Sequence, residues 1–356
     1  MPTKLSANLD FLRAVAVLLV LAQHLLYRWH VGQRLGMDIP PVGTFGVLLF
    51  FVHTCLVLMY SMERSHLRGF SLARNFYVRR AFRIYPLSIL AVMTAVALHL
   101  DSGVNGVPGL SHAEPVAIGR IVSNLLLVQN LIRPGSIINV LWSLPYEVQM
   151  YICLPFLFLW IRGRRSAAWY LCALWVGSVL LAVGRTQLAA HGAPVGLVAR
   201  LSLLEYVPNF LPGVLAFTLV HVQRIKSYLW PPFVLLLIVA YAMNPHTGTG
   251  WALCLLLGFA IPFFGEIRTP WLRVISNRIA TYSYGIYLSH QFCIWFVDGP
   301  LSAFPLWSRI IVLGAMLIAL PILLYHAIER PMIKVGARLA DKLEPRRRPV
   351  AARALS

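Results

Sequence analysis

The stretch LDFLRAVAVLLVLAQHLL, Leu9 to Leu26, is an apolar run long enough to cross a lipid bilayer. It also carries Arg13 and His24, although a charged group in the hydrocarbon region costs ~2.5–3.5 kcal/mol on insertion scales. The two residues are eleven positions apart, so on a helix they lie about 20° apart on one face and ~16 Å apart along the axis. Snorkelling of Arg13 and a purely structural His24 are the simpler interpretations. The pair together favours a polar cavity lined by this helix.

The composition extends this interpretation to the whole chain. Of 356 residues, 59% are hydrophobic and 12% are charged, and the mean hydropathy is +0.72. Soluble domains carry about 25% charged residues, so the chain is predicted to be a polytopic membrane protein. The first apolar run is too long for a secretory signal peptide and contains Arg13. All five cysteines lie in apolar runs without a CxxC pair, which is typical of small core residues.

Apolar runs bounded by charge, proline or glycine predict an all-α fold with about ten transmembrane helices. The predicted spans are 9–28, 43–61, 84–100, 140–161, 167–184, 203–223, 230–243, 250–265, 279–297 and 307–328. Residues 117–132 are amphipathic and predict a short interfacial or re-entrant helix.

Charge sets the expected orientation. With both termini in the cytoplasm, 23 of the 31 Lys and Arg residues fall on the cytoplasmic side and seven on the outer side. The net charge of +19 is therefore mainly a topology signal, and nucleic acid is not an expected partner.

A carboxylate lies in the fourth predicted span. Glu147 occurs in VLWSLPYEVQMY, residues 140–151, and the predicted topology places it near the depth of His24. A carboxylate beside an imidazole fixes the ring tautomer, so we expect Glu147 to orient His24. Pro145 would widen the site by freeing a backbone carbonyl. Pairing of Glu147 with another cation is the alternative.

A cluster of arginines precedes the third predicted span. In RNFYVRRAFRIYP, residues 74–86, Arg79, Arg80 and Arg83 are grouped, with Arg79 and Arg83 on one helix face. Arginine clusters suit bidentate binding of phosphate. The simpler interpretation is an anchor that follows the positive-inside rule.

Three further ionisable residues lie in or near predicted spans. His290 is in the outer half of the ninth span, in TYSYGIYLSHQF, and Glu329 is at the inner end of the tenth, in YHAIERP. Glu329 could pair with an arginine of the cytoplasmic cluster. His53 lies in the middle of the second span, and the sequence assigns it no role.

Together these segments resemble the acyltransferase-3 family of integral membrane O-acyltransferases, in the order in which that family presents its motifs. The matching segments are LDFLRAVAVLLVLAQH with its Arg13 and His24, GVLLFFVHTCLVL, YVRRAFRIYP, LWSLPYEVQMY, SYGIYLSH and IERP. One departure is clear. The second-helix motif of the family usually ends in Ser-Gly-Phe, whereas this chain has Thr54, Cys55 and Leu56, preceded by His53. The departure suggests a subfamily with a different acceptor.

The resemblance implies a reaction and roles for the residues. Acetyl-CoA, or another acyl-CoA, would enter from the cytoplasm as donor substrate, and the acyl group would pass to a hydroxyl of a carbohydrate or glycolipid. We expect Arg13, Arg79, Arg80 and Arg83 to bind the donor and His24, oriented by Glu147, to act as general base. The residues expected to bind the acceptor or support the site are His290, Trp142, Ser143, Tyr284 and Glu329. Neither a metal site nor a permanently bound cofactor is expected.

The resemblance also implies an organisation and a location. Residues 1–332 would form the transmembrane acyltransferase domain and residues 333–356 a basic cytoplasmic tail, with no extracytoplasmic esterase-like domain. The expected location is the bacterial inner membrane, where the bilayer surrounds the protein and a separate periplasmic protein could accept the acyl group. Acetyl is the favoured group, and succinyl is compatible with the basic lining.

Two alternatives stay open. A covalent acyl-His24 intermediate would serve the same chemistry as direct attack. A proton-coupled transporter of a small anionic solute would also place Arg, His and Glu inside the membrane, but no half-to-half repeat is visible.

Overall fold

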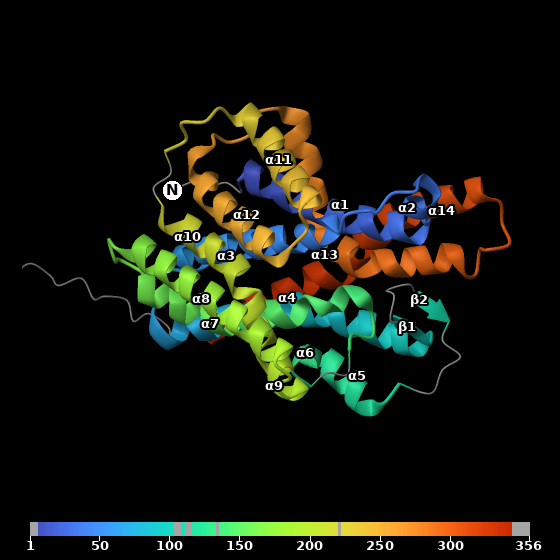
Figure 1. Cartoon of the computed structure of the whole chain (residues 1–356), viewed down its shortest axis with the longest axis horizontal. Helices are drawn as coiled ribbons and strands as arrows, with labels where there is room; N and C mark the ends of the chain where they lie inside the picture. The colour runs from blue at the N-terminus through green and yellow to red at the C-terminus, as the bar shows by residue number, and fades with distance from the viewer. Residues whose placement is uncertain (1–5, 103–107, 111–115, 133–134, 220–221, 344–356) are drawn as a thin grey trace, which may run out of the picture.

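The computed structural model describes residues 6–102, 108–110, 116–132, 135–219 and 222–343. These residues form a bundle of long helices with short helices in the connections (Figure 1). The main helices are α1 (Ala7–Arg28), α3 (Val42–Ser65), α4 (Gly69–Ala97), α7 (Leu144–Ile161), α8 (Ala167–Ala190), α10 (Val207–Thr218), α11 (Trp230–Met243), α12 (Thr247–Ala260), α13 (Pro270–Asp298), α14 (Leu306–Leu324) and α15 (Arg330–Lys342). The predicted helical fold is therefore confirmed.

Within the described residues, six helical segments are long and apolar enough to cross a membrane. They are Ala7–Arg28, Val42–Ser65, Gly69–Ala97, Asn139–Ile161, Ala167–Ala190 and Leu306–Lys342. Three shorter apolar segments match the sixth, seventh and eighth predicted spans: Val207–Thr218, Ser227–Met243 and Thr247–Phe263. Helix α13 covers the ninth predicted span. The count of ten crossings and the side of each terminus stay predictions.

Two helices differ from their predicted spans. Helix α4 begins at Gly69 rather than near residue 84, so the arginine cluster lies within this helix and not in a segment before it. Helix α14 continues through a π-helical turn, η5 (Tyr325–Glu329), into α15, which packs along α4. A methyl group on Gly336 of α15 would lie 2.5 Å from Cβ of Phe82, so the two backbones approach closely.

The connections contain short elements. Strands β1 (Leu100–Ser102) and β2 (Pro108–Leu110) form an antiparallel pair. The amphipathic segment predicted at 117–132 is confirmed as helical, with α5 (Ile118–Leu125) and α6 (Gln129–Ile132). The other short helices and turns are α2 (Val31–Leu35), η1 (Asn139–Trp142), α9 (Val195–Arg200), η2 (Ser202–Glu205), η3 (Ser227–Leu229) and η4 (Ile261–Phe263).

Helix α1 packs chiefly against α3 and α13 and is held at both ends. At its start, Ser6 Oγ donates to Glu266 Oε1 at 2.6 Å. At its end, Arg28 Nε donates to Asp298 Oδ2 at 2.5 Å, and the other oxygen of Asp298 pairs with Arg309 of α14. These contacts fix α1 relative to α13, which matters because both helices carry site residues.

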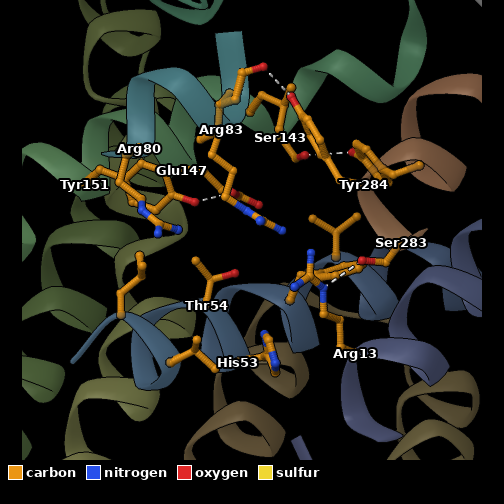
Figure 2. Close-up of a pocket in the computed structure, with 17 residues that line it drawn as sticks. Arg13, His53, Thr54, Arg80, Arg83, Ser143, Glu147, Tyr151, Ser283 and Tyr284 are labelled. Atoms are coloured by element: carbon orange, nitrogen blue, oxygen red, sulfur yellow. Dashed lines mark hydrogen bonds between the residues drawn. The ribbon is translucent and has the colours of Figure 1, made fainter. Parts of the chain in front are cut away.

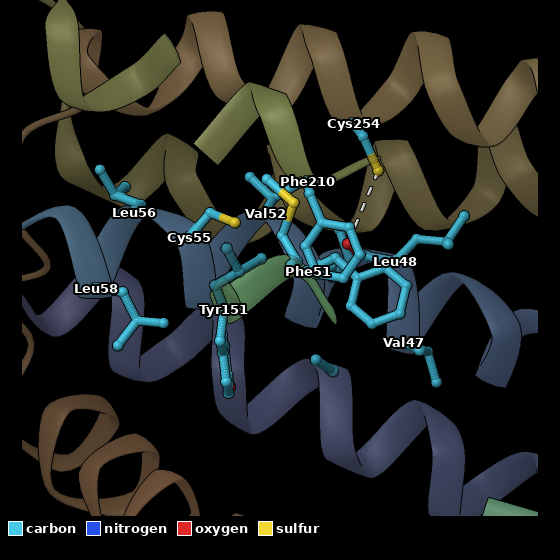
Figure 3. Close-up of a cluster of buried hydrophobic side chains, with 14 of the residues drawn as sticks. Val47, Leu48, Phe51, Val52, Cys55, Leu56, Leu58, Tyr151, Phe210 and Cys254 are labelled. Carbon is cyan, nitrogen blue, oxygen red and sulfur yellow. Dashed lines mark hydrogen bonds between the residues drawn. The ribbon is translucent and has the colours of Figure 1, made fainter. Parts of the chain in front are cut away.

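Helix α3 is the most buried of the long apolar helices and forms the centre of the core. Figure 3 shows its side chains packed against α10 and α12, with the rings of Phe51 and Phe210 stacked 4.1 Å apart between centroids. Cys55 and Cys254 are fully buried there, and all five cysteines are free. The prediction that they act as small core residues holds for the buried ones, whereas Cys153 is exposed.

Close contact between α3 and α10 depends on Gly213. A methyl group built there would lie 2.1 Å from the carbonyl oxygen of Val52. We expect Gly213→Ala to lower stability by ~1–3 kcal/mol, because inserted volume in a packed core forces backbone shifts. Thermal unfolding of the purified protein measures this. Gly177→Ala is the matched control, since no neighbour lies within 4 Å of the added group. Equal melting temperatures for both variants would contradict the expectation.

Candidate active site

Five helices enclose a polar cavity in the middle of the bundle. Its walls come from α1, α3, α4, α7 and α13, and its volume, measured as the space open to the centres of water molecules, is ≈ 90 Å³. The ionisable side chains that line it are Arg13, His53, Arg80, Arg83, Glu147, Tyr151, Tyr284 and Tyr287. Figure 2 shows Arg13 and His53 on one wall, facing Arg80, Arg83 and Glu147 on the other.

Three of the four arginines predicted to bind the donor meet in this cavity. Arg13 lies two turns into α1, and its Nε donates to Ser283 Oγ of α13 at 2.7 Å. Arg80 and Arg83 enter from α4, and Arg83 Nη2 lies 3.3 Å from Glu329 Oε1. The expectation that Glu329 pairs with an arginine of this cluster is thus confirmed.

Arg79 is placed elsewhere. Its Nη2 pairs with Asp341 of α15 at 2.6 Å, its Nε donates to Asn75 Oδ1 at 2.8 Å, and it does not line the cavity. Arg79 and Arg83 do share a helix face, as predicted, but that face is turned toward the C-terminal helix. Only Arg83 reaches the cavity as well.

The cavity carries an excess of positive charge. Glu147 is the only carboxylate in its lining, where it accepts a hydrogen bond from Tyr151 at 2.8 Å and interacts electrostatically with Arg13, Arg80 and Arg83. Even with Glu329, which pairs with Arg83, counted beside Glu147, three guanidinium groups leave one positive charge in excess, which favours an anionic ligand.

A pair of histidines lies beyond the cavity, where α1 meets α13. Nε2 of His290 lies 3.2 Å from Nδ1 of His24, and the ring centroids are 4.9 Å apart. Nδ1 of His24 is also 2.8 Å from the carbonyl oxygen of Val20. Nδ1 of His290 is 2.9 Å from the carbonyl oxygen of Ile286. The predicted site residues His24 and His290 are therefore direct partners.

The backbone contacts determine the tautomers of the neutral rings. A carbonyl oxygen only accepts, so both Nδ1 atoms carry the proton. His290 Nε2 then accepts from His24. Among the described residues, Nε2 of His24 has no hydrogen-bond partner, and the side chain is half-buried. This nitrogen presents a lone pair that can take a proton from a substrate.

Glu147 was predicted to orient His24, but the two side chains are not partners in the structure. His24 is oriented by Val20 and His290, whereas Glu147 belongs to the arginine cavity, whose lining does not include His24. The reason is a difference in depth. The chain before α7 folds inward as η1, so that Ser143 meets Tyr287, and Glu147 lies one turn further along α7.

Ser143 and Tyr287 connect the cavity to the histidine pair. The hydroxyl of Tyr287 donates to the carbonyl oxygen of Val140 at 2.6 Å, so Ser143 Oγ donates to it at 2.7 Å. Tyr287 lies one turn before His290 on α13, with 6.4 Å between ring centroids. Tyr287 therefore holds the inward-folded turn η1 against the helix that carries His290.

The remaining predicted residues occupy supporting positions. Tyr284 lines the cavity and donates to the carbonyl oxygen of Ile84 at 2.8 Å. Trp142 does not line it and packs against Tyr146 and Tyr206, with centroid distances of 6.2 and 5.6 Å. That Tyr284 and Trp142 bind or support an acceptor stays a prediction.

The sequence analysis assigned no role to five of the polar residues that line the cavity. They are His53, Thr54, Tyr151, Ser283 and Tyr287. A usable signal existed on two helices. Tyr151 follows Glu147 by four positions, and Ser283, Tyr287 and His290 recur at intervals of four and three. Those intervals place side chains on one helix face.

Comparisons with known proteins identify the family of this chain. Residues 6–326 match the acyltransferase-3 family profile, described as an acyltransferase domain. A Staphylococcus aureus protein named "Putative O-acetyltransferase" is 25% identical over 93% of this chain and 58% of its own length. A Bacillus subtilis protein named "Putative peptidoglycan O-acetyltransferase YrhL" is 27% identical over 93% of this chain and 55% of its own length.

A third relative matches over a shorter stretch. The "Peptidoglycan O-acetyltransferase OatA" of Listeria monocytogenes is 28% identical over 45% of this chain and 25% of its own length. This chain thus spans little more than half the length of the first two relatives. No solved structure matches. Because the family profile covers nearly the whole of the described bundle, the chain belongs to the acyltransferase-3 family.

Proposed function

We propose that this protein is a membrane O-acetyltransferase that takes the acetyl group from cytoplasmic acetyl-CoA and transfers it to a hydroxyl of a carbohydrate. Family membership and relatives named as O-acetyltransferases support the reaction class. Two relatives are named for peptidoglycan, which supports an envelope carbohydrate or glycolipid as acceptor and the bacterial inner membrane as location.

The arginine cavity is the proposed donor site. Coenzyme A carries several negatively charged phosphate oxygens, which suit the excess of guanidinium groups from Arg13, Arg80 and Arg83. By the predicted topology, Arg13 lies in the cytoplasmic half of α1, and acetyl-CoA is available in the cytoplasm. No cofactor needs to stay bound between turnovers, because the donor itself is consumed.

His24 is the proposed general base. Its free Nε2 takes the proton of the acceptor hydroxyl, and the oxygen attacks the thioester carbonyl. The tetrahedral intermediate collapses by breaking the carbon–sulfur bond. The imidazolium returns its proton to the departing thiolate, so coenzyme A leaves as a thiol and the acetyl ester is formed.

One observation carries the proposal: helices α1 and α13 contribute both to the cation-lined cavity, through Arg13 and Ser283, and to the histidine pair. Arg13 and His24 are separated along α1 by ~16 Å. An extended carrier arm, bound by its phosphates at one level, can present its thioester at the other. This separation matches a donor with a charged head and a long neutral arm.

The test uses the purified protein in sealed phospholipid vesicles with acetyl-CoA labelled in the acetyl group. We expect label to move to a hydroxylated glycan as a base-labile ester, together with one free thiol per ester. Protein that binds no acetyl-CoA and catalyses neither hydrolysis nor transfer would contradict the proposal. Flux of a small anion in the same vesicles would then favour the transporter alternative.

A further inference from the structure

His53 lies where the second helix departs from the family motif, and it lines the arginine cavity together with the adjacent Thr54. The side chain is only 5% exposed. Figure 2 shows its imidazole on the same wall as Arg13, opposite Arg80 and Arg83. An unusual sequence position therefore coincides with the cavity that we propose as the donor site.

The register between α1 and α3 sets the depth of His53. A methyl group on Gly43 would meet Gln23, and one on Gly46 would meet Ala16 and Val20. The two helices are therefore antiparallel, and the same pairing continued along α3 brings His53 to the level of Arg13.

His53 differs from the other two intramembrane histidines in its contacts. His24 and His290 each have a backbone carbonyl partner, at 2.8 and 2.9 Å. Among the residues that the structure describes, His53 has no hydrogen-bond partner. A ligand in the cavity that His53 lines could therefore supply the partner that the imidazole lacks.

The chemistry of the ring suggests which part of a ligand it meets. The guanidinium groups suit phosphate oxygens. A neutral imidazole offers one N–H donor and one lone pair, which suit an amide or a thioester carbonyl. The arm of an acyl-CoA carries amides between its phosphates and its thioester, so with the phosphates bound by the arginines an amide of the arm would lie near His53.

We propose that His53 is a donor-binding residue that hydrogen-bonds an amide in the uncharged arm of the acyl donor. The assignment rests on the proposed function of the cavity. It relates the departure from the family motif to the donor and not, as the sequence suggested, to the acceptor. It also explains why an imidazole is buried among cations.

The experiment measures steady-state turnover of labelled acetyl-CoA by the full chain in vesicles. We expect His53→Leu to raise KM for acetyl-CoA about tenfold, as loss of one or two hydrogen bonds implies, with a smaller change in kcat. His53→Gln, which keeps a donor and an acceptor, should recover part of the loss. His191→Leu is the matched control, because His191 is exposed at the end of α8 and should leave KM unchanged.

Unchanged KM in His53→Leu would overturn the inference while leaving the proposed function intact. Loss of kcat at constant KM would also overturn it, since that pattern belongs to a catalytic base. Absence of turnover in the unmodified protein would instead contradict the proposed function.

If His53→Leu does not fold, carbethoxylation of histidines in the unmodified protein tests the inference instead. Coenzyme A should protect His53 from the reagent but leave His191 reactive, as read by mass spectrometry. Equal labelling of His53 with and without coenzyme A would overturn the inference.

Discussion

His24→Ala is expected to reduce acetyl transfer by about 10²–10⁴-fold, the usual contribution of a positioned general base. The reason is geometric. Nε2 of His24 carries the lone pair, and the contacts with Val20 and His290 keep the ring in the tautomer that exposes it. Binding of acetyl-CoA should change little, because His24 does not line the arginine cavity.

The measurement compares transfer of labelled acetyl in vesicles with equilibrium binding of acetyl-CoA. His191→Ala serves as control for the loss of an exposed imidazole. Near-normal turnover by a folded His24→Ala protein would refute the role of general base. Labelled protein trapped at His24 without acceptor would favour the acyl-histidine intermediate over direct attack.

Arg83→Leu is expected to raise KM for acetyl-CoA by about 10- to 100-fold, since hydrogen bonds to charged groups contribute ~1.5–3 kcal/mol. The substitution removes a guanidinium group from the cavity and leaves Glu329 buried without its counter-ion, because that carboxylate is fully buried 3.3 Å from Arg83. Some loss of stability should therefore accompany the effect on binding. A double variant, Arg83→Leu with Glu329→Leu, separates the two effects.

Arg79→Leu is a closely matched control for this prediction. Arg79 lies one turn earlier on α4 and carries the same group, but its side chain pairs with Asp341 outside the cavity. Its KM should stay within about twofold of the unmodified protein, as expected for an exposed ion pair that contributes little. Equal effects of Arg79→Leu and Arg83→Leu would show that the donor is bound by the cluster as a whole.

Much of this architecture could be predicted from residue patterns. Apolar runs located the long helices, and the eleven-residue spacing correctly placed Arg13 and His24 on one face of α1, which packs against α13. The arginine cluster was recognised because guanidinium groups at a span boundary are conspicuous against an apolar background. These signals are local, so each can be recognised from the sequence of a single helix.

The partners of these residues could not be predicted in the same way. Glu147 was assigned to His24 from its depth in a straight span, but the inward fold of η1 shifts the start of α7. Arg79 looked equivalent to Arg83 until α15 supplied Asp341. His53 had no assigned role because the groups that surround it in the cavity come from four other helices. Such contacts depend on tertiary packing, which spacing along one helix does not encode.

The π-helical turn at Tyr325–Glu329 has a consequence for the whole C-terminal helix. A π-turn accommodates one residue more than an α-turn, and each residue advances a helix by ~100°. The turn therefore acts as a phase shift between the span α14 and the extension α15. On one side of the turn α14 packs on α13, and on the other side Gly336 faces Phe82 of α4. One extra residue thus sets the rotation of α15 relative to α14, so that each helix presents its own packing face to a different neighbour.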